Sequence, residues 1–296
     1  KLGEAVEAAL RGLRDSVSEI EAGIGAAAVV QSGGSDAPDS LLTSFLGSFA
    51  GRVPTRDRLH VFTTNYDRVL EWGAELAGLR IVDRFVGSLE PVFRSSRLEV
   101  DLHYTPPGSP KEPRHLDGVV RLTKLHGSLD WRWRAERRQI VREPAPFGHA
   151  DGEVSDLMIY PNAAKDVETT FYPFADLFRD FSAALCRPNS TLVIYGYSFG
   201  DEHINRIIRD MLTIPSTHIL IIAYSDDGQR ISQFVHRYRG TGQVSLMLGP
   251  AFADIERLTR DWLPRPAAAA VSRAQASILA ETAPLAAQQA SGADHD

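Results

Sequence analysis

The sequence predicts an α/β fold with a Rossmann-like, mostly parallel sheet and helices on both of its faces. The first observation is a set of short apolar runs, at 60–64, 119–125, 191–195 and 218–223, which have the length and composition of buried strands. The second is that segments with helical periodicity separate these runs. Strands that alternate with helices are typical of parallel sheets with right-handed crossovers.

The N-terminal elements follow from periodicity and turn residues. Residues 4–24 place apolar side chains three and four positions apart, which indicates an amphipathic helix. A loop rich in Gly, Ser, Asp and Pro at 31–40 leads to a second helix at 41–50. The next expected elements are the strand at 60–64, a helix at 67–77 and a short strand at 80–85.

The middle of the chain is expected to leave the sheet and return to it. Residues 86–118 show no regular pattern, and the run at 119–125 brings the chain back. Residues 131–140 alternate aromatic, charged and apolar side chains, which predicts a β-hairpin outside the main sheet. A short strand is expected at 157–160.

The C-terminal half alternates helices and strands. Residues 171–185 carry large apolar side chains on one face of a helix, and residues 202–212 do the same. The remaining elements expected here are strands at 191–195, 218–223 and 244–248 and helices at 232–238 and 252–263.

Two boundaries frame this domain. We expect the folded domain to occupy residues 1–263, because the composition shifts to Ala, Gln and Ser from Pro264 onwards. Residues 264–296 are expected to be a tail or a partner-docking segment. The chain starts with Lys1 rather than Met, so we expect it to begin inside a longer protein.

Composition excludes several classes of protein. The 296 residues carry a net charge of -6 and show no basic stripe, which argues against direct binding to nucleic acid. No apolar run approaches the roughly 20 residues of a membrane span. The single cysteine, Cys186, excludes a disulfide framework and a four-cysteine zinc site, and it suits a reducing cytoplasm. We therefore expect a cytoplasmic protein with no metal site.

Polar residues stand where three of the predicted strands end. Asn65 and Asp67 follow the first strand, His126-Gly127 follows the second, and 196–201 follows the third. In open α/β sheets, ligands bind in the crevice beyond the carboxyl ends of the strands. The three strand ends therefore predict one shared crevice.

The first two strand ends also have structural interpretations. Asn65 is a good capping residue for the helix that follows, and Asp67 suits the positive first turn of that helix. A lone histidine such as His126 often has a structural role, although an imidazole that titrates near ~6.5 can act as a general base. Gly127 allows a ligand to approach the backbone closely. The sequence alone leaves both interpretations open.

The third strand end also supports two interpretations. The backbone amides of 196–201 and the helix N-terminus can receive phosphate or ribose oxygens. The same stretch fits G-x-S-x-G around Ser198, which raises the alternative of an α/β-hydrolase. The histidines that follow Ser198 are His203, His218, His236 and His295. None of them lies in a loop suited to a triad.

Together, the three motifs resemble the sirtuin-like family, and more narrowly its branch in bacterial antiphage defence. They are Thr63-Thr64-Asn65-Tyr66-Asp67, then Lys124-Leu125-His126-Gly127-Ser128, then Tyr195-Gly196-Tyr197-Ser198-Phe199-Gly200-Asp201-Glu202. The resemblance runs from about residue 41 to 263. It implies that Asn65 orients the nicotinamide ribose and the attacking water, that Asp67 supports the site, and that His126 is the general base. The residues implied to bind NAD are Gly127, Gly196, Tyr197 and Ser198, with Ser225 and Asp226 towards the adenosine end.

The chain departs from the family in two ways. The glycine-rich loop that opens the family's fold is missing, and we expect it to precede Lys1. The cysteine pairs that hold zinc in deacylating members are also missing, and the segment around 128–160 is expected to replace that module.

The resemblance implies an NAD+ hydrolase that uses NAD as substrate, contains no zinc and acts as the effector of an antiphage defence complex. It also implies a homo-oligomer held in check by a partner ATPase such as a HerA-type translocase. The alternatives are a non-enzymatic scaffold or regulator of a partner ATPase or nuclease, and a sirtuin-type deacylase or ADP-ribosyltransferase.

Overall fold

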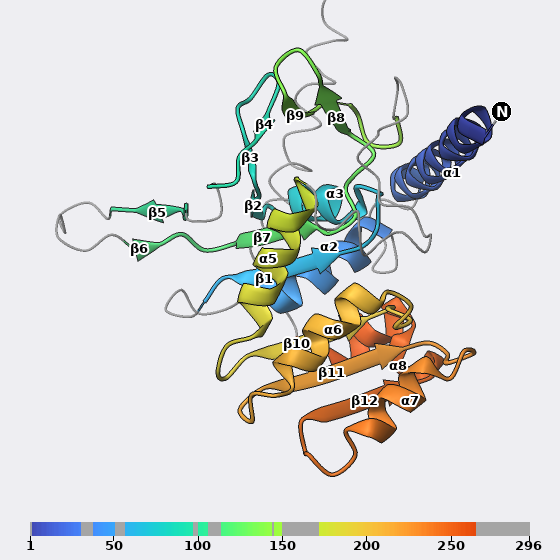
Figure 1. The fold of residues 1–296 in the computed structure, drawn as a ribbon, viewed down its shortest axis with the longest axis vertical. Coiled ribbons are helices and arrows are strands. Elements are labelled where there is room, and N and C mark those ends of the chain that lie inside the picture. Colours follow the sequence, from blue (N-terminus) through green and yellow to red (C-terminus); the bar gives the residue numbers. More distant parts are fainter. Residues whose placement is uncertain are drawn as a thin grey trace, which may run out of the picture.

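Two parallel β-sheets form the centre of the fold (Figure 1). The computed structural model describes residues 2–30, 38–50, 57–96, 100–105, 114–143, 145–149 and 172–264. The first sheet has the order β1-β7-β2, formed by Leu59–Thr63, Val119–Lys124 and Arg80–Val82. The second has the order β10-β11-β12, formed by Thr191–Tyr195, His218–Ala223 and Val244–Leu248. All neighbouring strands in both sheets are parallel, which confirms the predicted class, although the strands are divided between two sheets.

Helices cover both faces of the second sheet, as predicted. Ile219 and Ile221 of β11 pack in a cluster with α5 (Phe174–Leu185), α6 (Glu202–Met211) and α7 (Arg230–Arg237). Ile222 of the same strand points the other way, towards a cluster that includes α2 and the C-terminal helices. Because side chains alternate along a strand, this division shows that β11 is sandwiched between two helical layers.

The first cluster also joins the two sheets. It includes Leu125, directly after β7, and Ile194 of β10, with α5 crossing in front of the strands in Figure 1. Phe62 of β1 packs edge-on against Phe181 of α5, with ring centroids 5.0 Å apart. The two sheets therefore share one hydrophobic core.

The remaining helices match the sequence prediction with two differences. The described helices of the N-terminal half are α1 (Leu2–Val30), α2 (Pro38–Ala50) and α3 (Val69–Leu76), so the first is longer than expected. The predicted helix at 252–263 is divided into α8 (Pro250–Ala253), α9 (Ile255–Arg257) and the π-helix η2 (Leu258–Trp262). The break lies at Asp254, which has extended backbone angles and accepts a hydrogen bond from the Arg257 amide at 3.1 Å.

The strand β10 is less buried than its composition suggested. We predicted burial on both faces, but Thr191 and Tyr195 are exposed and only Ile194 is buried. The reason is its position, because β10 is the edge strand of its sheet and β11 is the central one.

An insertion stands apart from the parallel strands. Its antiparallel sheet has the order β3-β4-β9-β8, formed by Phe85–Val86, Val92–Phe93, Gln139–Arg142 and Trp131–Arg134. The hairpin predicted at 131–140 is therefore confirmed, and it pairs with residues of the stretch expected to be irregular. A second ribbon, β5 (His103–Tyr104) with β6 (Arg114–His115), projects from the body (Figure 1).

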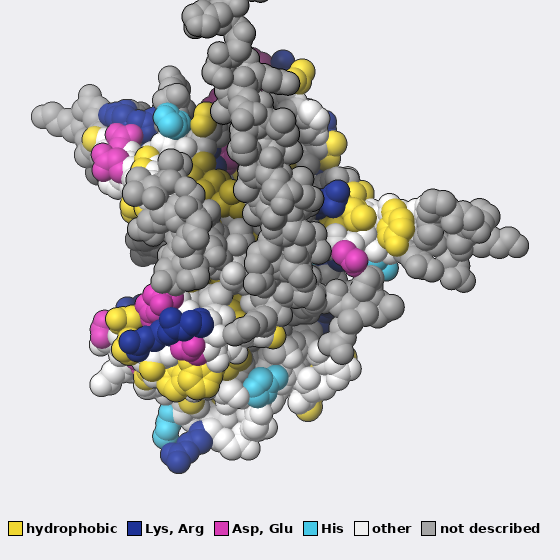
Figure 2. Space-filling model, turned by 180° about the vertical axis from the view of Figure 1, so that it is seen from behind, with side chains coloured by type: hydrophobic (Ala, Val, Ile, Leu, Met, Phe, Trp, Pro, Cys, Tyr) yellow, Lys and Arg dark blue, Asp and Glu magenta, His cyan; other side chains and the backbone are white. Residues whose placement is uncertain are grey.

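Several predictions lie outside the described residues: the loop at 31–37, the strand at 157–160 and the tail from 265. Among the helices that are described, none combines the length and the apolar character needed to cross a bilayer. In the view from behind, Lys and Arg side chains lie beside acidic ones on the described surface (Figure 2).

Candidate functional site

The register of β1 and β7 brings the first two motifs together. Thr63 pairs with Lys124, and the Leu125 amide donates to the Thr63 carbonyl at 2.8 Å. Asn65 and His126 each lie two residues beyond this pair, so both stand at the same edge of the sheet. Asn65 is exposed, whereas His126 is only 3% exposed.

Asn65 does not cap the helix that follows it. The helix α3 begins at Val69, and its N-cap is Arg68 without a capping side chain. Asp67 provides the local hydrogen bond instead, because its Oδ1 accepts from the Val69 amide at 3.1 Å. The backbone amide of Asn65 donates to Thr63 Oγ1 at 3.1 Å. The capping alternative for Asn65 is therefore wrong, and its carboxamide lies on an exposed loop.

The loop that carries Asn65 is held by Lys124, which is 3% exposed. The Lys124 ammonium donates to the Asp67 carbonyl and, at 3.4 Å, to the Tyr66 carbonyl. It also lies 3.1 Å from Glu71 Oε1. Burial raises the pKa of the Glu71 carboxyl, and the Lys124 ammonium opposes that rise. Lys124 was part of the second motif, but its contacts with this loop and with Glu71 were not predicted. A lysine inside an apolar strand was a signal that could have revealed them.

A pair of buried histidines joins the second and third motifs. His126 Nε2 lies 3.2 Å from Nε2 of His203, which is in the first turn of α6 and is also 3% exposed. The ring of Phe178 packs edge-on against His203, with centroids 4.8 Å apart. A carboxylate oxygen of Asp201 completes a cluster whose three ligand atoms lie within 4.8 Å of one another. The sequence analysis considered His203 only as a triad candidate, so this pairing was missed.

The loop between β10 and α6 presents Ser198 and backbone to solvent. Gly196 has a φ of 69°, a left-handed conformation that favours glycine, and its amide donates to the Ile222 carbonyl at 3.2 Å. Ser198 is exposed. Tyr197 turns inwards, where its hydroxyl accepts from the Asp201 amide at 3.2 Å and lies 3.0 Å from Asn205 Oδ1. Burial raises the pKa of the Tyr197 hydroxyl. The Tyr197 hydroxyl therefore stabilises the loop by internal hydrogen bonds and does not point towards solvent.

The loop after β11 lies beside this one. Ser225 is exposed and donates to Asp227 Oδ2 at 3.0 Å. Asp226 accepts from the amides of Ile231 and Ser232, at 3.0 and 2.8 Å. Burial alone would raise the pKa of Asp226, but these hydrogen bonds hold it below its usual range. Asp226 therefore accepts hydrogen bonds from backbone amides in the first turn of α7.

Arg230 connects the two loops. A Cβ atom on Gly200 would lie 2.9 Å from Arg230 Nη1, and one on Gly228 would lie 3.1 Å from its Nε. The guanidinium therefore packs against the ends of both loops. Arg230 was not among the predicted site residues. It places a positive charge beside Gly200, in the loop that was predicted to receive phosphates.

The geometry does not assemble a hydrolase triad around Ser198. His203 faces His126, and His218 Nε2 lies 3.0 Å from Ser245 Oγ at the opposite edge of the sheet. His236 lies in the last turn of α7, and His295 is outside the described residues.

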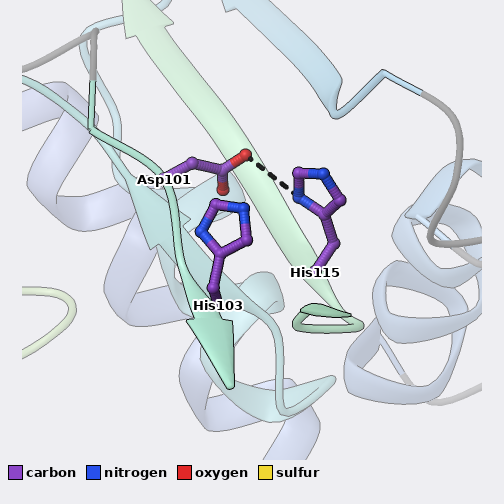
Figure 3. Close-up of side chains that lie close together, drawn as sticks. All are labelled: Asp101, His103 and His115. Carbon is purple, nitrogen blue, oxygen red and sulfur yellow. Dashed lines mark ion pairs between the residues drawn. The ribbon is translucent and has the colours of Figure 1, made fainter. Parts of the chain in front are cut away.

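A second cluster with metal-ligand chemistry lies on the projecting ribbon (Figure 3). His103 and His115 are cross-strand partners, and Asp101 Oδ2 lies 3.6 Å from His115 Nδ1. The same carboxylate is bound by Arg58, whose Nε lies 3.0 Å from Oδ1. This cluster therefore already contains a neutralised carboxylate.

Residues 59–240 match the family of SIR2-like domains. The matched range covers more than half of the chain and includes every residue predicted from the three motifs. No curated protein matches the chain.

Proposed function

The chain belongs to the family of SIR2-like domains, which use NAD, and from this premise we propose that it is an NAD+ hydrolase. The reaction breaks the bond between the nicotinamide nitrogen and C1′ of the ribose. Nicotinamide leaves with the bonding electron pair, and the oxygen of a water molecule bonds to C1′. The products are nicotinamide, ADP-ribose and one proton.

The observation that carries this proposal is the juxtaposition of Asn65 and His126 at the tips of two hydrogen-bonded parallel strands. In the proposed mechanism, the Asn65 carboxamide holds the ribose hydroxyls and the attacking water, since it is exposed and not used as a cap. The His126 imidazole accepts the proton that the water loses. Preorganised groups of this kind stabilise the positive charge that develops on the ribose.

In this proposal, the loops after β10 and β11 bind the rest of the dinucleotide. Ser198 and the backbone at Gly196 face the ribose and phosphates, with Arg230 nearby as a cation. Ser225 lies towards the adenosine end, and Gly127, with a φ of 88°, allows close approach beside His126.

A specific observation favours a second candidate, a non-enzymatic regulator of a partner ATPase or nuclease. His126 is buried and its Nε2 faces the imidazole of His203 rather than solvent. A structural histidine pair would have this arrangement as well.

Nicotinamide release from NAD by the full-length protein separates the two candidates. We expect Asn65→Ala and His126→Ala each to lower the rate by at least about 100-fold, the usual contribution of a positioned base. The matched control is His218→Ala, since His218 begins β11 at the edge opposite the site. Circular dichroism checks the fold of each variant. Cleavage by His126→Ala at the wild-type rate would remove His126 as the base, and no cleavage by the wild-type protein would favour the regulator.

We propose further that this activity is the effector of a cytoplasmic antiphage defence complex. Uncontrolled destruction of NAD is toxic, so activity should depend on assembly. A closed symmetric homo-oligomer with a HerA-type ATPase is the expected form. Charges of both signs on the described rear face (Figure 2) support a protein partner rather than nucleic acid.

Light scattering at micromolar concentration, with and without the product of the adjacent gene, tests the assembly. A monomer in both conditions that cleaves NAD at the full rate would contradict it.

A further inference from the structure

The distance between the two ring nitrogens of the buried histidine pair is compatible with two ligands on one metal ion. His126 Nε2 and His203 Nε2 lie 3.2 Å apart. Imidazole nitrogens bind Zn²⁺ at roughly 2.0–2.1 Å, so two such ligands at a tetrahedral or cis-octahedral angle are separated by about 2.9–3.4 Å. The observed separation falls within this range.

The third group of the cluster supplies a negative charge. A carboxylate oxygen of Asp201 lies within 4.8 Å of one ring nitrogen of each histidine. Asp201 is the N-cap residue of α6, and its side chain makes no capping hydrogen bond there.

We propose that His126, His203 and Asp201 form a binding site for a divalent transition-metal ion, with Zn²⁺ as the best match. Two imidazoles and one carboxylate suit Zn²⁺ and its neighbours in the first transition series. They do not suit Mg²⁺ or Ca²⁺, which prefer oxygen ligands only. This site was not predicted from the sequence, because the expectation of no metal rested on the single cysteine.

Metal binding and the hydrogen bond between the rings exclude each other. In the metal-free pair, one ring donates an Nε2–H to the other ring. Both Nε2 atoms must present a lone pair to the metal, so the donor ring moves its proton to Nδ1. The ion thus occupies the space in which the two rings otherwise share a proton.

Local charge favours this cluster over the one on the ribbon in Figure 3. There, Asp101 is bound by Arg58 at 3.0 Å and lies 3.8 Å from Arg121, so two guanidinium charges oppose a cation. His103 of that cluster is also exposed and therefore less fixed in position. The ribbon cluster provides the matched control.

The site would also regulate the enzyme, a consequence that rests on the proposed function. With a metal ion on Nε2 and the ring proton on Nδ1, neither ring nitrogen of His126 can accept a proton from water. Zinc is therefore expected to inhibit NAD cleavage reversibly.

Calorimetric titration of the full-length, chelator-treated protein with Zn²⁺ tests the site without any enzyme assay. We expect one tight ion per chain, with an affinity that falls at least about tenfold in His203→Ala, since loss of even an outer-shell partner typically costs 10–100-fold. Asp201→Asn keeps the packing of the pair and should also weaken binding. The control His103→Ala should bind within about twofold of wild type. Substitution with Co²⁺ should give visible absorption typical of a site with nitrogen ligands.

Tight binding that survives both His203→Ala and Asp201→Asn would overturn the proposal, as would no tight binding at all. Loss of that binding in His103→Ala would assign it to the ribbon cluster. Inhibition is measured separately, as nicotinamide release with and without zinc. Binding without inhibition overturns the regulatory role alone, and absence of NAD cleavage in zinc-free protein overturns the proposed function but not the site.

Discussion

Lys124 supports the loop that carries Asn65, and Lys124→Met tests that support. The Lys124 ammonium is buried, lies 3.1 Å from Glu71 Oε1 and donates to the carbonyls of Tyr66 and Asp67. Methionine has a similar length and keeps the packing of the stem. It removes the charge and all of these hydrogen bonds at once.

The expected loss of stability follows from the Glu71 carboxylate, which Lys124→Met leaves without its cationic partner. Removing one partner of a buried ion pair costs about 3–5 kcal/mol, because the other charge is left uncompensated. The Glu71 side chain is 20% exposed, which places the expected loss near the lower limit, at about 3 kcal/mol. Lys124→Met combined with Glu71→Gln should regain about 1–2 kcal/mol, since the stranded carboxylate is gone.

The pH dependence of the stability loss in Lys124→Met is a second test of the same ion pair. Burial raises the pKa of Glu71, and loss of Lys124 raises it further. A carboxyl whose pKa is higher in the folded than in the unfolded state loses stabilisation as the pH rises through the folded value. The loss of unfolding free energy caused by Lys124→Met should therefore be larger at about pH 8 than at about pH 5.

Urea unfolding followed by circular dichroism measures these differences. A loss below about 1 kcal/mol, or no recovery in the double variant, would refute the reasoning. NAD cleavage should fall in Lys124→Met through a higher KM or lower kcat even below the unfolding transition, because the Asn65 loop loses its anchor.

Two further predictions concern other buried groups. Burial, and to a smaller extent the guanidinium of Arg121, lowers the pKa of His60 from 6.5 to about 4. The free energy of unfolding should therefore fall by up to about 3 kcal/mol as the pH drops from 6.5 towards 4. The stability advantage of wild type over His60→Gln should shrink by about 2 kcal/mol between pH 7.5 and pH 5, and an unchanged difference would contradict this pKa. Glu21 is fully buried and accepts from the amide and Nη2 of Arg68 at 2.6 Å, so Glu21→Ala should cost about 3 kcal/mol and expose α1 to protease. The exposed Glu19→Ala is its control, and equal protease resistance of the two variants would show that this pair does not hold α1.

The strands and helices could be predicted because burial leaves a local pattern in the sequence. The run at 218–223 became β11, the central strand of its sheet. Strand pairing is not local, so the division into two sheets and the edge position of β10 left no comparable pattern. The break at Asp254 depended on a single capping hydrogen bond, which an apolar periodicity does not reveal.

The position of the candidate site residues at the strand ends could be predicted, but the buried side chains that contact them could not. The rule that ligands bind beyond the carboxyl ends of parallel strands selected Asn65 and His126 without knowledge of their neighbours. Lys124 and His203 act through partners 57 and 77 residues away in the chain. Their roles depend on the three-dimensional packing of elements that the sequence does not connect.

Two buried ion pairs connect the Asn65 loop and the helix that follows it to α1 and β7. Arg68 pairs with Glu21 of α1, and Lys124 of β7 pairs with Glu71 of α3. Buried pairs of this kind contribute little net stability compared with apolar packing, but breaking either partner is costly. They therefore restrict the loop to one arrangement relative to α1 and β7. In the proposed mechanism the Asn65 carboxamide holds both a ribose and a water molecule. It would need such a fixed loop, because an error of about 1 Å in position can cost 100-fold in rate.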